Sequence, residues 1–342
     1  MKTAPLAALL AALVLAAAPL RAQDHSATPA PVAATVEQDS AAVTLTAQEP
    51  AAGEQAAPAG EHEAGPVDII TPHITDGDHM EIPYWKFPFF KEIELPHWKP
   101  IVIGGLSFDM SPSKHVVFLL LGSTILFLMM VLAARSLRRA AVKGEAPKGG
   151  ANAIEAMILY IRNEVILPNV GHHGEGFVPY LLTAFFFILT LNLIGLVPYG
   201  STATGNISVT ATLAIMTFIT VEVAGVRAQG WGYLNTLFYW NNDLPIVLRP
   251  VLFLIMSPVE MIGKLTKPFA LAIRLFANMT AGHIVVLALM GLIFSFAGPL
   301  SAAPLFMSVL IMVLELFVAF LQAFIFTLLS SVFIGQIRES HH

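Results

Sequence analysis

The sequence predicts an all-α membrane protein with five transmembrane crossings and additional interfacial helices. Hydrophobic residues make up 56% of the 342 residues, and charged residues make up only 12%. The mean hydropathy is +0.72, and these values together are not typical of a soluble protein. In residues 114–342, charges cluster between apolar runs long enough to cross the ~30 Å hydrocarbon core of a bilayer. The chain contains no cysteine, which excludes disulfides, thiolate metal sites and cysteine nucleophiles.

The chain before the first span is predicted to be exported. Residues 1–22 combine Lys2, a short apolar stretch and small residues, as in a secretory signal peptide. An uncleaved anchor is the alternative, although the apolar stretch is short for one. Residues 23–65 are rich in Ala, Pro and acidic residues without Lys or Arg, which predicts a disordered acidic tail. Residues 66–113 alternate aromatic residues with prolines, which favours an exported segment in the membrane interface.

The first span is predicted at about residues 115–134, after a helix start at Ser111 and Pro112. The basic cluster at 135–143 follows at once and marks that side as cytoplasmic. Residues 151–167 place apolar side chains on one helical face. This pattern predicts a helix lying on the cytoplasmic surface of the membrane.

The second and third spans are predicted at about 177–198 and 207–225, joined by an outer loop without Lys or Arg. Arg227 then returns the chain to the cytoplasmic side. Glu222 falls in the last turns of the third span, where it can snorkel to the surface, and we assign it no role. Residues 228–264 mix aromatic, polar and apolar residues and are predicted to form an interfacial connector.

The last two helices are predicted at 268–297 and 304–338, joined around Pro299 without a basic residue. About thirty residues make ~45 Å of helix, against a ~30 Å hydrocarbon core. We therefore predict a hairpin of two long and strongly tilted helices. Five crossings place the N-terminus outside and the C-terminus inside. Every basic cluster after the first span then lies on the cytoplasmic side.

Arg274 lies inside the first helix of this hairpin. An arginine at membrane depth costs from ~3 to more than 10 kcal/mol, so it normally faces a partner or water. It follows Lys267 by seven residues, about 10 Å of helix rise, which is too deep to snorkel easily. Asn278 lies one turn further on the same face. The alternative interpretation of Arg274 is a structural ion pair inside a helix bundle. Small residues nearby would let another helix approach closely: Ala277, Ala281 and Gly282.

Counting outward from Pro299 predicts which polar side chains of the hairpin lie at equal depth. His283 lies sixteen residues before Pro299 and Glu315 sixteen residues after it, so we expect these two to meet. Gln322 lies within one turn of the depth of Arg274. Four polar groups are thus expected to converge on two otherwise apolar helices. The alternative interpretation is that His283 and Glu315 are only a hydrogen-bonded core pair.

The run of residues from Arg274 to Gly282 reads Arg-Leu-Phe-Ala-Asn-Met-Thr-Ala-Gly and resembles the signature of the a subunit of F-type ATP synthases. The run at 315–326, Glu-Leu-Phe-Val-Ala-Phe-Leu-Gln-Ala-Phe-Ile-Phe, and the run at 192–198, Asn-Leu-Ile-Gly-Leu-Val-Pro, also resemble that family. The resemblance covers roughly residues 66–338.

Two departures from the family pattern stand out. The family often has an acidic residue where Asn206 stands, so a channel carboxylate at that position is absent. In several members, a carboxylate occupies the position of His283 and an imidazole that of Glu315, which is the reverse of this sequence.

The resemblance implies a proton-translocating stator subunit of the bacterial inner membrane, not catalytic itself, with two aqueous half-channels against a c-ring. The implied partners are c subunits, whose ionisable carboxylate faces Arg274, the b subunits of the peripheral stalk and lipid, with no nucleic acid, cofactor or metal. Glu260 is a candidate for the cytoplasmic half-channel, and a solvated carboxylate is the alternative. The implied proton-translocation residues are Arg274, Asn278, His283, Glu315 and Gln322.

The alternative function is a secondary transporter that uses Arg274 to bind an anionic substrate. Such transporters usually show internal repeats and helices broken at matching places in two halves. Five spans do not divide into halves, and no repeat is evident in the sequence. A membrane enzyme is disfavoured because the chain has no metal-ligand helix motif and no serine or cysteine triad signature.

Overall fold

The computed structural model describes most of the chain from residue 79 onward. The predictions made for residues 1–22 and 23–65 lie outside the described residues. The described ranges are 79–83, 90–98, 101–103, 106–108, 111–146, 149–171, 174–197, 200, 202–233, 248–296 and 298–339.

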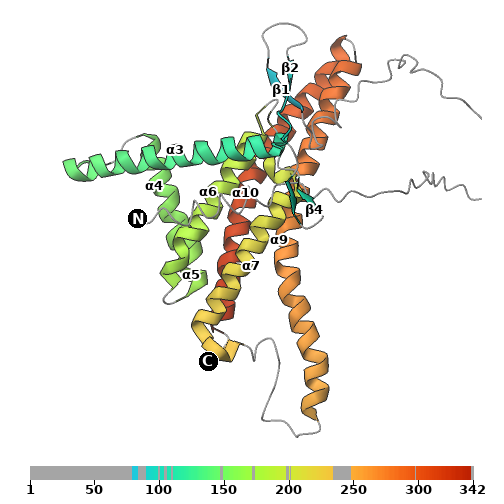
Figure 1. The fold of residues 1–342 in the computed structure, drawn as a ribbon. Coiled ribbons are helices and arrows are strands. Elements are labelled where there is room, and N and C mark those ends of the chain that lie inside the picture. Colours follow the sequence, from blue (N-terminus) through green and yellow to red (C-terminus); the bar gives the residue numbers. More distant parts are fainter. Residues whose placement is uncertain are drawn as a thin grey trace, which may run out of the picture.

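Five helices in the described part of the chain are long and apolar enough to cross a membrane, which confirms the predicted all-α membrane fold. Figure 1 shows α3 running at a steep angle to α10, which lies alongside α6 and α7. The spanning helices are α3 (Lys114–Lys143), α6 (Val178–Gly195), α7 (Ile207–Gln229), α9 (Leu248–Ser295) and α10 (Ala302–Glu339).

Helix α6 lies at the centre of the bundle. Its side chains are apolar around the whole circumference, which is typical of a helix buried on all sides. It packs against α3 and α10. Its fully buried residues form much of the core: Leu181, Phe187, Ile188 and Leu191.

The helix predicted at 151–167 is present as α4 (Gly150–Tyr160), the π-helical turn η1 (Ile161–Ile166) and α5 (Leu167–Val170), and its position on the membrane surface stays a prediction. The guanidinium of Arg338, at the end of α10, donates a hydrogen bond of 2.9 Å to the carbonyl oxygen of Val170. The side chains of η1 are partly buried, with Ile166 fully so. This segment is therefore docked on the bundle as well as amphipathic.

Four short strands precede α3, and the sequence interpretation did not predict them. β1 (His79–Pro83) pairs antiparallel with β2 (Phe90–Glu94), and β3 (Ile101–Ile103) pairs antiparallel with β4 (Leu106–Phe108). Both hairpins fall within residues 66–113. The placement of that segment in the membrane interface stays a prediction.

The predicted helix start at Ser111 is wrong. The N-cap position of α3 is Ser113. The hydroxyl of Ser111 instead accepts a hydrogen bond of 2.9 Å from the backbone N–H of Trp98. Serine side chains often bond to the backbone outside helices, so this residue anchors the preceding chain segment instead of capping the helix.

Helix α9 begins at Leu248 and not at Pro268 as predicted, so residues 248–264, the second half of the proposed interfacial connector, belong to this helix. Their position in the membrane interface stays a prediction. Both Pro258 and Pro268 lie inside this one helix. Proline normally interrupts a helix because it lacks a backbone N–H. Membrane helices tolerate it, since neighbouring groups satisfy the carbonyl that loses its partner.

The last two helices form the predicted antiparallel hairpin. A short 3₁₀ turn, η5 (Gly298–Ser301), joins α9 to α10 and contains Pro299. The two helices pack against each other, and both also pack against α7. The tilt of this hairpin against the membrane stays a prediction.

Candidate functional site

Arg274 lies on an uncovered face of α9. Its side chain is exposed, as are those of Ala277, Asn278 and Ala281. Among the described residues, no side chain forms a hydrogen bond or an ion pair with Arg274, so the alternative of a structural ion pair is not realised in this part of the chain. The opposite face of the helix is buried and includes Leu271, Ala272, Leu275 and Met279.

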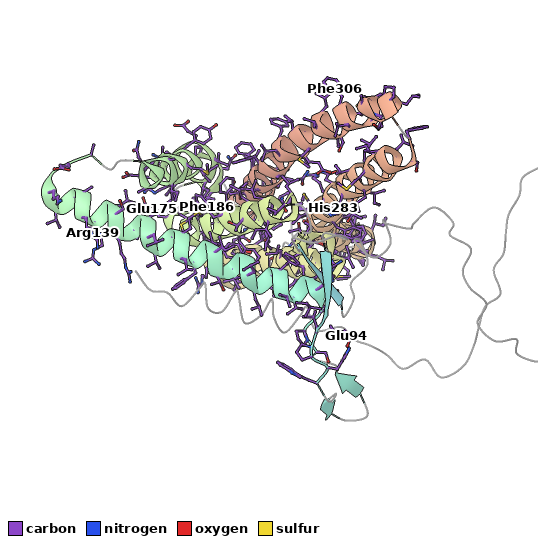
Figure 2. All side chains as sticks on the ribbon, turned by 90° about the horizontal axis from the view of Figure 1, so that it is seen from above. Glu94, Arg139, Glu175, Phe186, His283 and Phe306 are labelled. Carbon is purple, nitrogen blue, oxygen red and sulfur yellow. The ribbon has the colours of Figure 1, made fainter. Side chains whose placement is uncertain are left out.

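Glu315 reaches from α10 to α9 beside His283. A Cβ atom placed on Gly282 would lie 3.0 Å from the carboxyl carbon of Glu315, so Gly282 makes room for this carboxylate. Both His283 and Glu315 are half-buried. Figure 2 shows His283 on α9 where this helix runs beside α10. The two side chains thus come from the same level of the hairpin.

Gln322 and Arg274 do not share a surface. The side chain of Gln322 is only 4% exposed, whereas that of Arg274 is exposed. Counting residues from the turn predicts depth along the hairpin but not the direction of a side chain around its helix. The structure therefore brings Glu315 to the level of His283, places Gln322 in the interior, and leaves Arg274 and Asn278 on the open face.

A chain of buried polar groups connects the C-terminal end of α6 with α10. Thr204, in the 3₁₀ turn η3 (Ala203–Gly205), donates a hydrogen bond of 2.8 Å to the side-chain oxygen of Asn192. The side-chain nitrogen of Asn192 lies 3.4 Å from the carbonyl oxygen of Ala319, one turn after Glu315. Thr204 and Asn192 are fully buried. The signal for these polar groups in the sequence was a polar residue, Asn192, inside a long apolar run.

Three buried side-chain oxygens near these polar groups have no hydrogen-bond partner among the described residues. They belong to Thr202, Thr280 and Glu315. A Cβ atom on Gly205 would lie 3.8 Å from the Thr280 hydroxyl and 3.9 Å from the Cβ of Thr202, so these two threonines flank the same glycine. Buried polar groups in proteins are almost always satisfied, often by ordered water. Each of these three buried oxygens is therefore suited to bind a water molecule.

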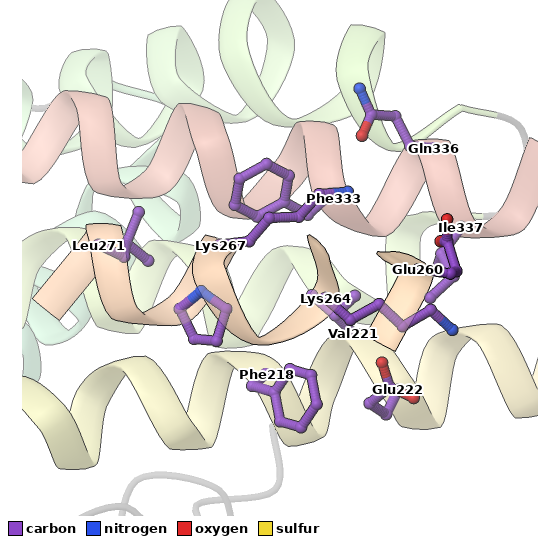
Figure 3. A pocket seen from close by; sticks show the side chains of 11 residues that line it. Phe218, Val221, Glu222, Glu260, Lys264, Lys267, Leu271, Phe333, Gln336 and Ile337 are labelled. Carbon is purple, nitrogen blue, oxygen red and sulfur yellow. The ribbon is translucent and has the colours of Figure 1, made fainter. Parts of the chain in front are cut away.

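A cavity of about 200 Å³ lies between α7, α9 and α10 (Figure 3). Its apolar wall includes Leu271, which lies one turn before Arg274 on α9. Glu260 lines the same cavity eleven residues earlier, which corresponds to about 16 Å of helix. The cavity thus extends along α9 to within one turn of Arg274. Its charged lining residues are Glu222, Glu260, Lys264 and Lys267.

Glu222 belongs to a hydrogen-bonded network that the sequence interpretation missed. The hydroxyl of Tyr233, in the turn η4 (Gly230–Tyr233), donates to the carboxylate of Glu222. The ammonium group of Lys264 donates to the same hydroxyl at 3.0 Å and lies 4.4 Å from the centre of the tyrosine ring. The network forms because η4 folds back onto α7, a contact that no local pattern predicts.

The described residues contain no group of three or more His, Asp and Glu side chains that could hold a metal ion. The polar groups of the candidate site are instead hydroxyls, carboxylates, an imidazole and fixed cations. Such groups accept, donate or repel protons.

The family match and the individual relatives found by comparison with known proteins all carry the name ATP synthase. The family described as ATP synthase A chain matches residues 116–335. ATP synthase subunit a 2 of Chlorobaculum tepidum is 43% identical over 319 residues, which cover 92% of this chain and 84% of that relative. ATP synthase subunit a 2 of Chlorobium luteolum is 44% identical over 335 residues, covering 96% and 91%. ATP synthase subunit a of Anaeromyxobacter dehalogenans is 42% identical over 354 residues, covering 95% and 89%.

Proposed function

The chain belongs to the ATP synthase subunit a family, and we propose that it moves protons at the open face of α9, against a ring of partner subunits. As a member of this family it is the proton-translocating stator subunit of the membrane sector, a multi-pass protein of the inner membrane. The alternative of an independent anion transporter is not supported. The observation that carries the proposal is the exposed Arg274 on a membrane-spanning helix.

An arginine on an open face requires a partner in the membrane. A guanidinium facing lipid costs at least ~3 kcal/mol. Arg274 has no hydrogen-bond or ion-pair partner among the described residues, and its neighbours Ala277 and Ala281 are small. Small side chains let a second helix approach closely. The proposed occupant is a helix of the c-ring that brings an ionised carboxylate next to Arg274.

The chemistry follows from the fixed charge of Arg274. A guanidinium does not deprotonate in proteins, so it cannot relay a proton and instead blocks direct passage along α9. It attracts an ionised carboxylate and thereby favours proton loss from a ring subunit that arrives beside it. Asn278, one turn away on the same face, offers hydrogen bonds to the same partner. The membrane potential supplies ~2.3 kcal/mol per charge per 100 mV, which biases the direction of rotation.

Two half-channels reach the ring from opposite sides of Arg274. On the outer side, His283 and Glu315 exchange protons at one level of the hairpin, and the unsatisfied buried oxygens of Glu315, Thr202 and Thr280 support a water-filled inlet. Gln322 in the interior provides an amide donor and acceptor near the depth of Arg274. On the cytoplasmic side, the cavity that runs from Glu260 to Leu271 supports the second half-channel.

We also propose that the chain carries out no catalysis itself and that b subunits of the peripheral stalk hold it in place. Helix α3 offers a surface for such contacts, because Leu121, Leu128 and Leu132 point away from the bundle and are exposed. Exposed leucines on a spanning helix face either lipid or another helix. The stalk and the surrounding lipid share this surface.

Cross-linking tests the proposed contact with the ring. A cysteine introduced at Ala277, on the open face, is expected to cross-link to a cysteine in the ring subunit's helix within the assembled complex. Ala272→Cys is the matched control, since this alanine is only 5% exposed and lies on the opposite face of the same helix. Because the chain has no cysteine of its own, the product can be identified by its mass. Cross-linking from position 272 but not from 277 would contradict the assigned face.

The orientation of the chain is testable with the same approach. We propose a periplasmic N-terminus and a cytoplasmic C-terminus, because the basic cluster at 135–143 follows the first span. Ser40→Cys, in the part of the chain outside the described residues, is expected to react with an impermeant thiol reagent from the periplasm. Glu145→Cys, just after α3, is expected to react only from the cytoplasm. Labelling of position 40 from the cytoplasm would show that the proposed topology is wrong.

A further inference from the structure

We propose that Glu222 is a second proton-exchanging carboxylate at the cytoplasmic mouth, beside Glu260, and that Tyr233 and Lys264 hold it in position. The inference rests on the proposed function, since it requires the cavity between α7, α9 and α10 to be the cytoplasmic proton path. It assigns a role in proton transfer to a helix, α7, that carries none of the proton-translocation residues proposed above.

Two carboxylates reach the cavity from two different helices. Glu222 comes from the last turns of α7 and Glu260 from α9, and Figure 3 shows both at the same end of the cavity. Glu222 is half-buried in the wall, whereas Glu260 is exposed. A proton that moves between the cytoplasm and Leu271, at the other end of the cavity, can therefore bind to either group.

Tyr233 fixes the position of the Glu222 carboxylate. The tyrosine is 3% exposed, and its ring packs on Gly225, where an added Cβ atom would lie 2.5 Å from Tyr233 Cε2. The ring therefore has little freedom to move. Its hydroxyl donates to one oxygen of Glu222 and accepts a hydrogen bond from Lys264. The second oxygen of Glu222 is left to accept a proton from the cavity.

Tyr233 acts as a fixed donor in this network and not as a proton carrier. Burial raises the pKa of its hydroxyl above the usual range, and the hydrogen bond and charge of Glu222, followed by the charge of Glu260, raise it further. The phenol consequently stays protonated at neutral pH. Glu222 and Glu260 are left as the groups of this cluster that exchange protons there.

The charges that face Glu222 are balanced. Helix α9 contributes Glu260, Lys264 and Lys267 to the cavity, and η4 contributes the neutral hydroxyl of Tyr233. Helix α10 lines the cavity with uncharged residues, and its Phe333 ring lies 5.1 Å from the ammonium group of Lys267. Two lysines thus compensate the charges of two carboxylates in the wall of the cavity.

The proposed step is a simple proton exchange. A hydronium ion from the cytoplasm gives its proton to the second oxygen of Glu222 and leaves as water. The resulting carboxylic acid passes this proton to a water molecule deeper in the cavity and returns to the carboxylate. Glu260 performs the same exchange nearer the rim. Because each acid can serve alone, the two are expected to act as parallel entry points.

The test measures ATP-driven proton pumping by the intact complex in inverted membrane vesicles, with the pH on the cytoplasmic face varied. The variants are Glu222→Gln, Glu260→Gln and the double variant. Glutamine keeps the shape of glutamate and still accepts the hydrogen bond from Tyr233, but it does not take up a proton. Glu164→Gln is the control, an exposed carboxylate on the same side of the membrane and outside the cavity.

We expect each single variant to slow pumping moderately and the double variant to slow it beyond the product of the two single effects. The excess should exceed about twofold, since residues that share one task show coupling of this size or more. As the pH on the cytoplasmic face is raised and protons become scarce, pumping by Glu222→Gln should begin to decline at a lower pH than pumping by the unaltered complex, because fewer groups capture protons. Tyr233→Phe, which keeps the ring, should shift the pH profile in the same direction by a smaller amount.

Three results would overturn the inference: a double variant no slower than Glu260→Gln alone, an unchanged pH profile in Glu222→Gln, or a loss of activity that follows only from reduced assembly. Arg274→Ala separates this inference from the proposed function. If Arg274→Ala pumps normally, the proposed function fails. If Arg274→Ala is inactive while Glu222→Gln behaves like the control, only the role of Glu222 is wrong.

Discussion

Replacing Arg274 by alanine is expected to abolish proton-driven ATP synthesis while leaving the complex assembled. The side chain is exposed and bonds to none of the described residues, so its removal leaves the packing of α9 intact. What is lost is the fixed charge that favours proton release from the ring and blocks direct passage between the half-channels. The measurement is ATP synthesis by vesicles in response to an imposed proton gradient. Passive proton leak is expected to rise in the same vesicles.

Arg274→Lys is expected to be nearly as damaging as the alanine variant. Lysine retains a positive charge, but it can lose its proton in an apolar site and does not offer the planar, forked donor geometry of arginine. Arg139→Ala is a suitable control, because it removes an exposed arginine at the end of α3, far along the chain from the hairpin. Undiminished coupled synthesis in either Arg274 variant would refute the central role of this residue.

The second large effect concerns His283 and Glu315. The carboxylate of Glu315 fits against Gly282, and its Oε1 atom is buried without a hydrogen-bond partner among the described residues. His283→Glu alone places two acids at this level of the hairpin, and Glu315→His alone places two imidazoles there. Unbalanced buried groups of this kind cost a few kcal/mol. Both single variants are therefore expected to slow proton transport strongly.

Exchanging the two residues restores one acid and one imidazole at the same depth. The double variant His283→Glu with Glu315→His is therefore expected to recover part of the lost transport. The readout is ATP-driven proton pumping in vesicles that contain equal amounts of assembled complex. If the double variant pumps no better than the worse single variant, the pair does not act as a unit.

Hydrophobic periodicity and charge predicted the positions of several spanning helices and of the turn between the last two. The positions of α3, α6 and α7 and the turn at Pro299 follow from apolar runs, basic clusters and a Gly-Pro break, all of which are local signals. Counting residues from the turn also predicted that Glu315 and His283 share a level. These features depend on distance along the chain, which a sequence states directly.

Other features depend on neighbours and were not predictable in this way. The early start of α9 was missed because Pro258 and Pro268 indicate helix ends in water, whereas packing and membrane burial keep the helix continuous. The separation of Arg274 from Gln322 depends on the rotation of each helix, which residue counting does not give. The link from Glu222 to Lys264 requires Tyr233 to fold back from η4.

The central claim is that protons cross the membrane only on the ring, past Arg274. The most direct test measures ATP hydrolysis and proton pumping together, in one preparation of inverted vesicles containing the assembled Arg274→Ala complex. The account predicts that hydrolysis drives no net proton accumulation, because protons pass straight between the two half-channels once the charge is gone. A ratio of protons pumped to ATP hydrolysed equal to that of the unaltered complex would contradict it.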